Sequence, residues 1–386
     1  MTTTNQPDKG RDARRRYLRR PRPRQNETGR WSHTYGAVDL GTNNCRLLVA
    51  KPNSGGFRVI DSFSRIVRLG EGVSQSGLLS EAAMDRTVEA LAICADKMKR
   101  RGVSRMRCVA TEVCRKADNT EAFVARVKDE IGMDLDVITT EEEAGLALDG
   151  CAPLLDYRNG HALVFDIGGG STELVWLRLT PGEENEIIGW TSIPYGVVSL
   201  TERHGDVSAS DDVYRNMMAE VGAHIDVFEK EHGIADIVAD GRVQMLGTSG
   251  TVTTLAGVHF GLKRYNRQRV DGAWLTSSKM IEICERLSMS DYGQRALEPC
   301  IGEERADLVV SGCAIVQAMH SVWPIRKMRV ADRGVREGLL QRLMREADQD
   351  AEKAAKASSG KPRNRNRYRR RRRRKNNAGQ PAKVSN

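Results

Sequence analysis

The sequence predicts an α/β protein made of two similar domains that face one another across a cleft. Segments with the residue pattern of strands alternate with segments typical of helices over residues 35–344. In addition, the run Ala-Val-Asp-Leu-Gly at residues 37–41 returns as Val-Phe-Asp-Ile-Gly at residues 164–168, so the two aspartates stand 127 positions apart. A repeat at the spacing of a whole domain indicates that one domain has been duplicated.

The first domain begins with three predicted strands, at residues 37–40, 45–50 and 57–63. A helix is predicted over residues 81–100, where apolar residues recur at helical spacing and Ser80 is placed to cap the N-terminus. The remaining elements are strands at residues 107–110 and 135–138 and helices at residues 119–131 and 142–148.

The second domain repeats this beginning, with a strand at residues 162–165, a glycine-rich turn at 166–171 and a returning strand at 172–177. The pattern then predicts more helices than strands. The helices are at residues 211–231, 276–287, 304–318 and 334–344, and the strands at 244–246 and 327–330, with a further turn at 247–250.

The ends of the chain differ from the part between them. Residues 1–32 and 347–386 contain few aliphatic side chains, so they cannot bury enough apolar surface to offset the entropy of ordering. We therefore predict a disordered basic arm and a disordered Arg-rich tail. The first domain is then expected over residues 33–158 and the second over 159–346, with the final helix packing back on the first domain.

Charge is divided unevenly along the chain. The net charge is +10, but residues 1–30 carry ten Lys/Arg against three Asp/Glu, and residues 351–386 carry fourteen against one. Residues 31–350 are therefore acidic, with a net charge of −10. The basic ends suggest a contact with RNA or another polyanion, such as a polyphosphate substrate, although a merely solubilising tail stays open.

Composition argues against several protein classes. Hydrophobic residues make up 39% and charged residues 29% of the chain, as in globular proteins, and no apolar run approaches the ~20 residues that span a membrane. The eight cysteines form no Cys-x-x-Cys pair, which argues against zinc and fits a reducing cytoplasm. No apolar stretch follows the N-terminal arginines, so we expect no export signal, no membrane contact and a cytoplasmic protein.

Three turns have the composition of phosphate-binding loops. Each follows a predicted strand, and its glycines let backbone N–H groups approach an anion while Ser and Thr add hydroxyl donors. A single turn of this kind indicates little, but three together predict a phosphate site. The candidate phosphate-binding residues are Gly41, Thr42 and Asn43; Gly168, Gly169, Gly170, Ser171 and Thr172; and Gly247, Thr248, Ser249 and Gly250.

Asp39 and Asp166 stand beside two of these turns. A carboxylate next to a bound phosphate would repel it unless a cation lay between them, which predicts Mg²⁺. The simpler alternative is that each aspartate only stabilises its turn through a hydrogen bond to the backbone. No Walker-type motif occurs, so the chain is not predicted to be a P-loop enzyme, yet the loops alone fit a kinase as well as a hydrolase.

These motifs resemble the exopolyphosphatase/guanosine pentaphosphate phosphatase (Ppx/GppA) family, a branch of the actin–Hsp70–sugar kinase superfamily. The resemblance covers the chain from about Tyr35 to about Leu343, and it implies two duplicated actin-like (ribonuclease H-like) domains. Gly-Gly-Gly-Ser-Thr-Glu and Glu-Glu-Ala are specific to the family, whereas the Asp-Leu-Gly loop is shared with kinases. The matching segments are residues 37–43, 68–72, 115–119 with Thr111, 142–144, 165–174, 247–251 and 332–338.

The resemblance implies an enzyme that releases terminal orthophosphate from polyphosphate, or from guanosine pentaphosphate, with Mg²⁺ (Mn²⁺ as the alternative ion) and an attacking water. It assigns Glu143 as catalytic base, Arg115 as a catalytic phosphate-binding arginine, and Asp166 as a carboxylate that orients the metal or the water. Asp39 and Glu173 complete the implied metal ligands. It further implies a homodimer, and a short form without the helical HD-type domain of longer relatives.

Other interpretations remain open at this stage. Without the resemblance, the acidic run at residues 141–143 is more simply a favourable helix start, and Arg115 a surface ion pair. An actin-like ATPase or sugar kinase has the same loops, and a non-catalytic regulator that binds polyphosphate or RNA has the same fold. The leading function is an exopolyphosphatase, and the nearest alternative is a guanosine pentaphosphate phosphatase of the stringent response.

Overall fold

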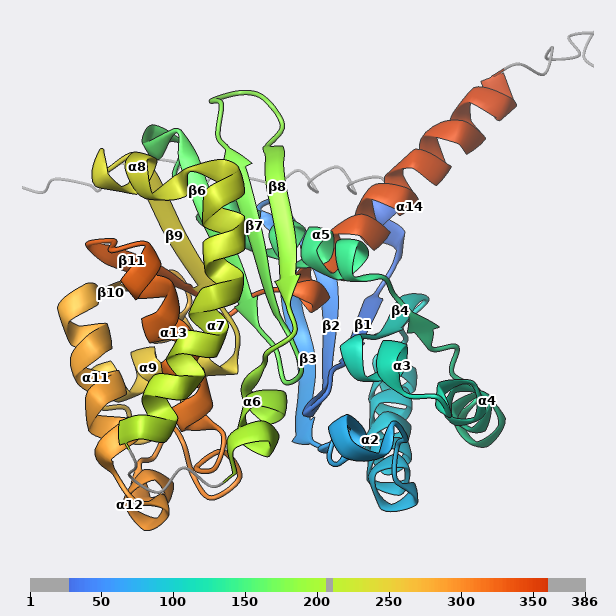
Figure 1. Ribbon diagram of the computed structural model, residues 1–386. Coiled ribbons are helices and arrows are strands. Elements are labelled where there is room, and N and C mark those ends of the chain that lie inside the picture. Colours follow the sequence, from blue (N-terminus) through green and yellow to red (C-terminus); the bar gives the residue numbers. More distant parts are fainter. Residues whose placement is uncertain (1–27, 206–210, 360–386) are drawn as a thin grey trace, which may run out of the picture.

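The computed structural model describes residues 28–205 and 211–359, which form two α/β domains (Figure 1). The domains have matching sheets. In the first, the strands are β1 (Tyr35–Leu40), β2 (Asn44–Asn53), β3 (Gly56–Ile66), β4 (Arg105–Ala110) and β5 (Asp136–Val137). In the second, they are β6 (His161–Ile167), β7 (Thr172–Arg178), β8 (Glu186–Ile193), β9 (Val243–Thr248), β10 (Trp274–Thr276) and β11 (Lys327–Ala331).

The strand order shows that the two domains are duplicates. The first sheet has the order β3-β2-β1-β4-β5, and the second contains the order β8-β7-β6-β9-β11, with β10 added at its edge. In both, the first three strands are antiparallel neighbours and the last two run parallel to the first strand. The predicted fold of two duplicated α/β domains is therefore confirmed.

Helices cover both sheets. Ser80 caps the N-terminus of α2 as predicted, because its side chain accepts a hydrogen bond from the amide of Ala83 (3.3 Å). The helices are α1 (Val73–Ser76), α2 (Glu81–Arg100), α3 (Glu112–Lys116), α4 (Thr120–Ile131), α5 (Thr140–Cys151), α6 (Val197–His204), α7 (Asp211–His232), α8 (Ile234–Ala239), α9 (Gly250–His259), α10 (Arg267–Val270), α11 (Ser277–Met289), α12 (Tyr292–Leu297), α13 (Val309–Val322) and α14 (Val335–Ser359).

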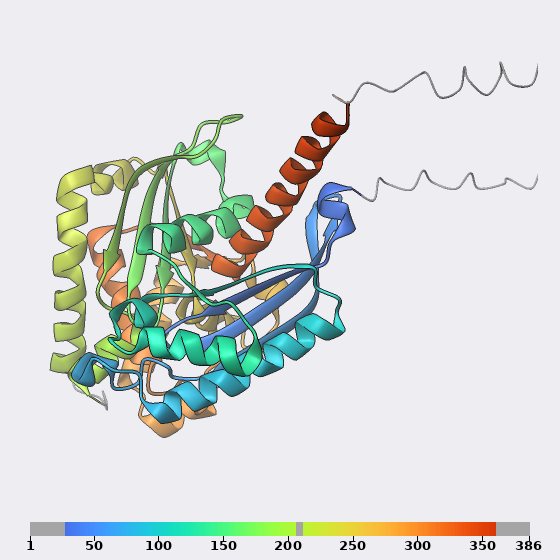
Figure 2. The ribbon, with the colours of Figure 1, turned by 90° about the vertical axis from the view of Figure 1, so that its right-hand side faces the viewer.

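Helices α5 and α14 lie side by side between the two sheets (Figures 1 and 2). Glycine makes this approach feasible, because a Cβ atom at Gly150 would collide with the carbonyl of Gly334, and one at Gly338 with the carbonyl of Leu146. The apolar face of α14, including Leu340, packs in one cluster with Ala37 of β1, so the last helix covers the first domain. This packing places α5 at the boundary between the domains.

The final helix is longer than the sequence indicates. The prediction of disorder from residue 347 is wrong for residues 347–359, which continue α14. Ala347 is buried, and Asp348 binds Arg30 of the short helix η1 (Gly29–Ser32) through an ion pair of 2.5 Å. These contacts supply the stabilisation that the local composition lacks. The rest of the predicted arm and tail, residues 1–27 and 360–386, lies outside the described residues.

Another boundary differs near the cleft. The helix predicted at residues 304–318 begins only at Val309, because residues 304–308 form a turn that ends in Leu308, the N-cap of α13. In this turn Asp307 pairs with Arg68 of the first domain (3.0 Å). Among the helices of residues 28–205 and 211–359, none is long and apolar enough to cross a membrane.

Candidate active site

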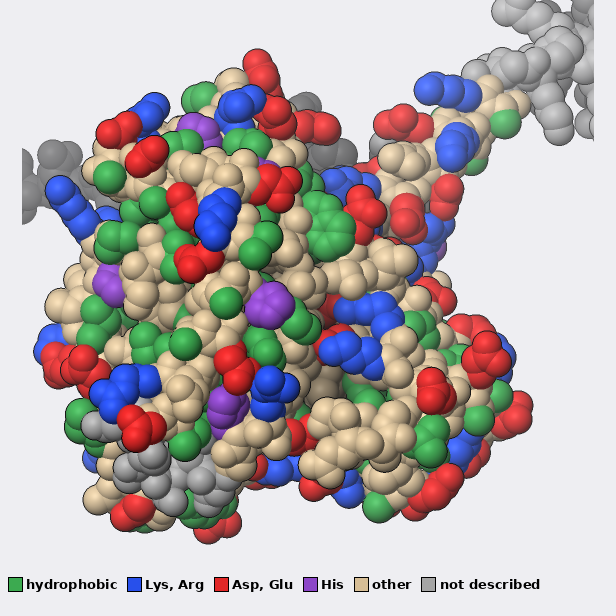
Figure 3. Space-filling model, in the orientation of Figure 1, with side chains coloured by type: hydrophobic (Ala, Val, Ile, Leu, Met, Phe, Trp, Pro, Cys, Tyr) green, Lys and Arg blue, Asp and Glu red, His purple; other side chains and the backbone are tan. Residues whose placement is uncertain are grey.

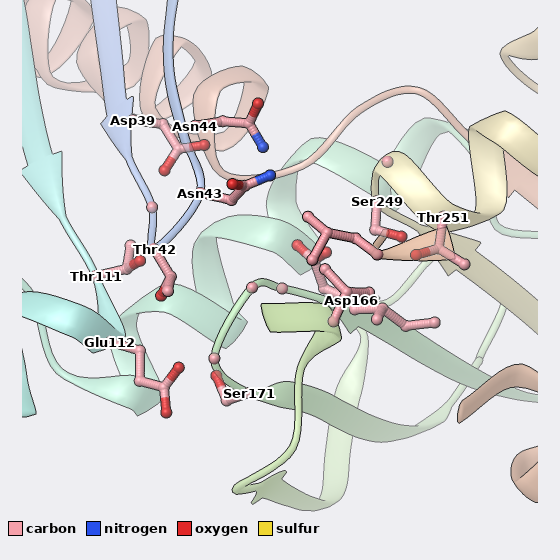
Figure 4. A pocket seen from close by; sticks show the side chains of 18 of the residues that line it. Asp39, Thr42, Asn43, Asn44, Thr111, Glu112, Asp166, Ser171, Ser249 and Thr251 are labelled. Atoms are coloured by element: carbon pink, nitrogen blue, oxygen red, sulfur yellow. The ribbon is translucent and has the colours of Figure 1, made fainter. Parts of the chain in front are cut away.

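A cavity of about 140 Å³ lies between the two domains, where the turns after β1 and β6 meet (Figure 4). The space-filling view shows the molecule hollowed between its two halves (Figure 3). Most of the predicted site residues line this cavity. They are Asp39, Gly41, Thr42, Asn43, Glu143, Asp166, Gly168, Gly169, Gly170, Ser171, Glu173, Ser249 and Gly250.

The first two turns have the same backbone geometry. The amide of Gly41 donates to the carbonyl of Asn44 and the amide of Gly168 donates to the carbonyl of Ser171, each at 2.9 Å. Both turns connect the first two antiparallel strands of their sheets. The repeat seen in the sequence is therefore one structural motif used twice.

The two turns also touch one another across the cleft. A Cβ atom at Gly169 would lie 2.8 Å from Cβ of Thr42, closer than real side chains approach. Glycine at this position is thus required for the two domains to close on one cavity. Together the turns place backbone amides and the Thr42 and Ser171 hydroxyls around a space that suits a phosphate group.

Asp39 and Asp166 stand near the ends of β1 and β6 and face the same cavity (Figure 4). Burial raises the pKa of Asp166 to about 6, and the nearby Asp39 adds to the rise. Burial likewise raises the pKa of Asp39. Arg46, which lies opposite Asp39 in the β1–β2 ladder, opposes both shifts.

These two carboxylates fit a magnesium ion. No hydrogen bond joins the carboxylate of Asp39 or Asp166 to another group in the described part of the chain, although both face the cavity. Two carboxylates beside a phosphate site, with water completing the shell, are the ligands that Mg²⁺ takes in phosphoryl-transfer enzymes. The two aspartates would hold the ion in the cavity that Arg46 also lines.

Glu173 is not gathered with the aspartates into one metal-binding group. Over residues 28–205 and 211–359, no three His, Cys, Asp or Glu side chains come close enough to share an ion. Oε1 of Glu173 instead accepts hydrogen bonds from the hydroxyls of Ser171 (2.5 Å) and Ser192 (3.0 Å). Burial raises the pKa of Glu173 to about 7, and these hydroxyls oppose the rise.

Glu143 reaches the cavity from the first turn of α5. Thr139 caps this helix, because its hydroxyl accepts a hydrogen bond from the amide of Glu142 (3.1 Å). Only 14% of the Glu143 side chain is exposed. Burial raises the pKa of Glu143 well above its usual range and the neighbouring Glu173 adds to this, whereas Arg115 opposes it.

Arg115 binds Glu143 and does not line the cavity. Its guanidinium lies 2.9 Å from Oε2 of Glu143 and also donates to the carbonyl of Ile138 (2.9 Å). In this arrangement the arginine to which the resemblance assigns phosphate binding pairs with Glu143, the base that the resemblance implies. Glu143 therefore lines the cavity, whereas the guanidinium of Arg115 contacts the side chain of Glu143 and the carbonyl of Ile138.

Only the second half of the third turn, residues 249–250, lines the cavity. Ser249 and Gly250 line the cavity at the start of α9, whereas Gly247 and Thr248 belong to β9 and do not. Gly247 is needed for packing, because a Cβ atom there would collide with the ring of Phe165. Thr172 also faces away from the cavity; its hydroxyl donates to the carbonyl of Tyr195 (2.7 Å).

Several lining residues were missed by sequence reasoning. Arg46 is the most informative, since an arginine inside the apolar run Cys-Arg-Leu-Leu-Val-Ala is unusual for a buried strand and could have drawn attention. Glu112 follows β4 and carried no motif signal. The others are Asn44, Thr111, Ile167, Val197, Thr251, Thr254, Arg305, Leu308, Val309 and Val335.

Known proteins are similar to this chain in sequence and in fold. The model of the Ppx/GppA phosphatase family matches residues 48–347. Exopolyphosphatase 2 of Mycobacterium tuberculosis is 30% identical over 296 residues, which cover 73% of this chain and 88% of that protein. The guanosine-5'-triphosphate,3'-diphosphate pyrophosphatase of Aeromonas hydrophila is 30% identical over 315 residues, or 81% of this chain, but the match spans only 60% of that longer protein.

Solved structures agree with the sequence matches. The Ppx/GppA protein of Aquifex aeolicus is 27% identical and superimposes with a TM-score of 0.65, covering 81% of this chain and 98% of that chain. A crystal structure described as an exopolyphosphatase-like protein is also 27% identical, with a TM-score of 0.73 over 81% of this chain.

Proposed function

Because the chain belongs to the Ppx/GppA phosphatase family and is a phosphohydrolase of that family, we propose that it releases terminal orthophosphate from a phosphate chain through attack by a water molecule. Inorganic polyphosphate is the leading substrate. Guanosine pentaphosphate is the alternative, because relatives with either activity in their names are equally similar to this chain.

The observation that carries this proposal is the position of Glu143. This buried carboxylate faces the same cavity as the two phosphate-type turns. A carboxylate there can accept a proton from water as the water attacks the terminal phosphorus, while the turn amides hold the phosphate oxygens in line. A sugar kinase would need a sugar hydroxyl at this point instead.

We propose Mg²⁺ as the cofactor, with Mn²⁺ as the alternative, held by Asp39 and Asp166. The ion would neutralise charge on the phosphate oxygens. Arg46 adds positive charge on the same side, so the ion and the arginine together would balance the negative charge of the phosphate. Glu143 accepts the proton, and Arg115 holds Glu143 in place through the 2.9 Å ion pair.

The test is phosphate release from long polyphosphate and from guanosine pentaphosphate, with and without Mg²⁺, beside the variant Glu143→Gln. Release that needs Mg²⁺ and is lost in the variant supports the proposal. A wild-type chain that releases no phosphate from either substrate, yet binds polyphosphate or RNA, would support the non-catalytic regulator instead. Turnover of ATP alone would support the ATPase alternative.

The basic ends suggest how a polyanion reaches an acidic body. We propose that residues 1–27 and 360–386 raise the local concentration of polyphosphate or RNA around residues 31–350, which carry a net charge of −10. Such an attraction weakens steeply with salt. A cytoplasmic location and a homodimer complete the proposal; sedimentation of the full chain tests the second.

A further inference from the structure

Glu202 on α6 of the second domain makes its hydrogen bonds to the first domain (Figure 1). Its Oε1 atom accepts from the amide of Gly72 (2.9 Å), and its Oε2 atom accepts from the hydroxyl of Ser74 (2.5 Å). Both donors belong to residues 67–74, which follow β3 and lead into α1. Hydrogen bonds to a carboxylate are stronger than those between neutral groups. Glu202 therefore joins the two domains at a point outside the lining of the active-site cavity.

Residues 67–74 also support the turn after β1. Two amides of this segment donate to the carbonyl of Asn43 (2.9 and 3.1 Å), and the amide of Gly70 donates to the carbonyl of Thr42 (2.9 Å). Gly70 packs so closely against this turn that a Cβ atom there would collide with the side chain of Thr42. The segment that Glu202 binds is therefore joined to the first phosphate-type turn by backbone contacts.

The N-terminus of α6 supports the turn after β6 in a similar way. Its first two amides donate to the carbonyls of Gly168 (3.0 Å) and Gly169 (2.7 Å), respectively. The hydroxyl of Ser199 donates to the carbonyl of Gly170 (3.0 Å). Glu202 lies on the same short helix. It thus links the helix that supports one turn with the segment that supports the other.

A second contact joins the same segment to the second domain. The guanidinium of Arg68 forms an ion pair with Asp307 (3.0 Å) and donates to the carbonyl of Glu304 (3.3 Å). Arg68 has a φ of 47°, a left-handed backbone that residues other than glycine rarely adopt. Such a conformation persists where the surrounding contacts impose it. The segment is therefore held in one conformation by contacts to both domains.

We propose that Glu202 is a positioning residue, which holds the two phosphate-type turns at the spacing that a phosphate chain needs and does so without touching the substrate. This inference rests on the proposed function, because it takes the turns to bind phosphate. With the two hydrogen bonds in place, the turns are held together before the ligand arrives. Without them, correctly spaced turns are present in only a fraction of the chains, and the apparent affinity falls by that fraction.

Charge alone predicts the opposite effect. Glu202 carries a negative charge, so its removal would strengthen the binding of a phosphate chain if Coulomb repulsion decided the affinity. The positioning role predicts weaker binding instead. The sign of the change therefore separates the two explanations.

The experiment measures the dissociation constant of inorganic tripolyphosphate by calorimetry in Mg²⁺ buffer. All proteins are full chains that also carry Glu143→Gln, so that hydrolysis does not consume the ligand. We expect Glu202→Ala to raise the constant about tenfold, and Ser74→Ala, which removes one of the two hydrogen bonds, to raise it about threefold. The double variant should match Glu202→Ala alone, because the contact of Ser74 is already lost there.

Two further variants exclude other causes. Glu220→Ala is the matched control, because it removes the same charge and breaks a contact to α6 within the second domain, the ion pair with Arg203 (2.8 Å). Its dissociation constant should stay within about twofold of that of the parent. Glu202→Gln keeps an acceptor for Gly72 and a polar group for Ser74, so it should restore most of the affinity that E202A loses.

Unchanged or tighter binding in E202A overturns the role of Glu202. So do losses that add up in the double variant, an equal loss in E220A, or a glutamine variant as weak as the alanine variant. Kinetics of the same changes with Glu143 intact give a second readout. E202A should raise KM about tenfold and change kcat much less, whereas partial misfolding would lower kcat at an unchanged KM.

The binding measurement also separates this inference from the proposed function. A wild-type chain that binds tripolyphosphate and releases no phosphate contradicts the proposed hydrolysis alone, and the comparison of E202A with its controls then still decides the role of Glu202. A chain that binds no tripolyphosphate overturns the inference, because the two turns would then hold no phosphate chain.

Discussion

The guanidinium of Arg115 lies 2.9 Å from the carboxylate of Glu143, and the two side chains are only 20% and 14% exposed. Arg115 comes from α3 and Glu143 from α5, so the pair joins two elements of the first domain beside the cavity. The arginine offsets part of the burial that raises the pKa of Glu143. The ion pair thus opposes the burial that favours the protonated form of Glu143.

Glu143→Gln is expected to lower kcat for phosphate release by about 10²–10⁴-fold, because glutamine cannot accept the proton from water. Thermal unfolding should change little, since the amide keeps the shape of the side chain. The matched control is Glu141→Gln, which alters an exposed glutamate in the same helical turn. Activity near that of the wild type in E143Q would remove Glu143 from its assigned role.

Arg115→Met is expected to destabilise the fold by roughly 1–3 kcal/mol, because it leaves a buried carboxylate without its cation. In the double variant with Glu143→Gln the cost should be smaller than the sum of the two single changes, by about 1 kcal/mol or more. Urea unfolding of the four proteins measures this coupling. Strictly additive changes would show that the 2.9 Å contact contributes nothing to stability.

Arg46→Met is expected to affect the substrate and the metal in opposite directions. The variant removes a positive charge beside Asp39 and Asp166, so phosphate binding should weaken and kcat/KM should fall about tenfold or more. At the same time the Mg²⁺ concentration for half-maximal activity should decrease, because less positive charge repels the ion. An increase in that concentration would contradict the placement of Mg²⁺ near Arg46.

Glu173 should make stability depend on pH in metal-free buffer. Its pKa rises from 4.5 to about 7 on folding, so between these values the folded chain keeps a proton that the unfolded chain releases. The stabilisation is present below about pH 4.5 and is lost as the pH rises through about 7. We expect the free energy of unfolding of the wild type, relative to Glu173→Gln, to decrease over this range. Urea titrations at several pH values measure the difference; a difference that increases with pH would contradict it.

Removal of the basic ends tests whether they attract the substrate. A chain of residues 28–359 keeps all of α14, including Asp348 and Asp350, which bind Arg30 and Arg105. We expect its KM for long polyphosphate to rise about tenfold at low salt, with a smaller rise for tripolyphosphate, because a long polyanion contacts more charges. An unchanged KM for the long chain would exclude the ends as a substrate tether.

Much of the fold and part of the site follow from local sequence. Strand alternation and the 127-residue repeat indicated two domains with the same turn, and the turns at Gly41 and Gly168 indeed have the same hydrogen bond. Glycine conformations and strand patterns depend on neighbouring residues, which is why they can be read from the chain. The prediction that Asp39, Glu143 and Asp166 meet at the cavity came from the motifs and the resemblance together.

Only the tertiary structure decided which side chains of each motif face the cavity. Thr172 and Thr248 belong to motifs, but their hydroxyls donate to the backbone carbonyls of Tyr195 and Arg333 instead of lining the cavity. Arg46 joins the site because the β1–β2 register sets it opposite Asp39, and Glu112 because closure of the two domains brings it against Gly170. Such contacts depend on register and on domain packing, which no short stretch of sequence encodes. The sequence determined that three phosphate-type turns exist, and domain packing determined which cations and carboxylates surround them.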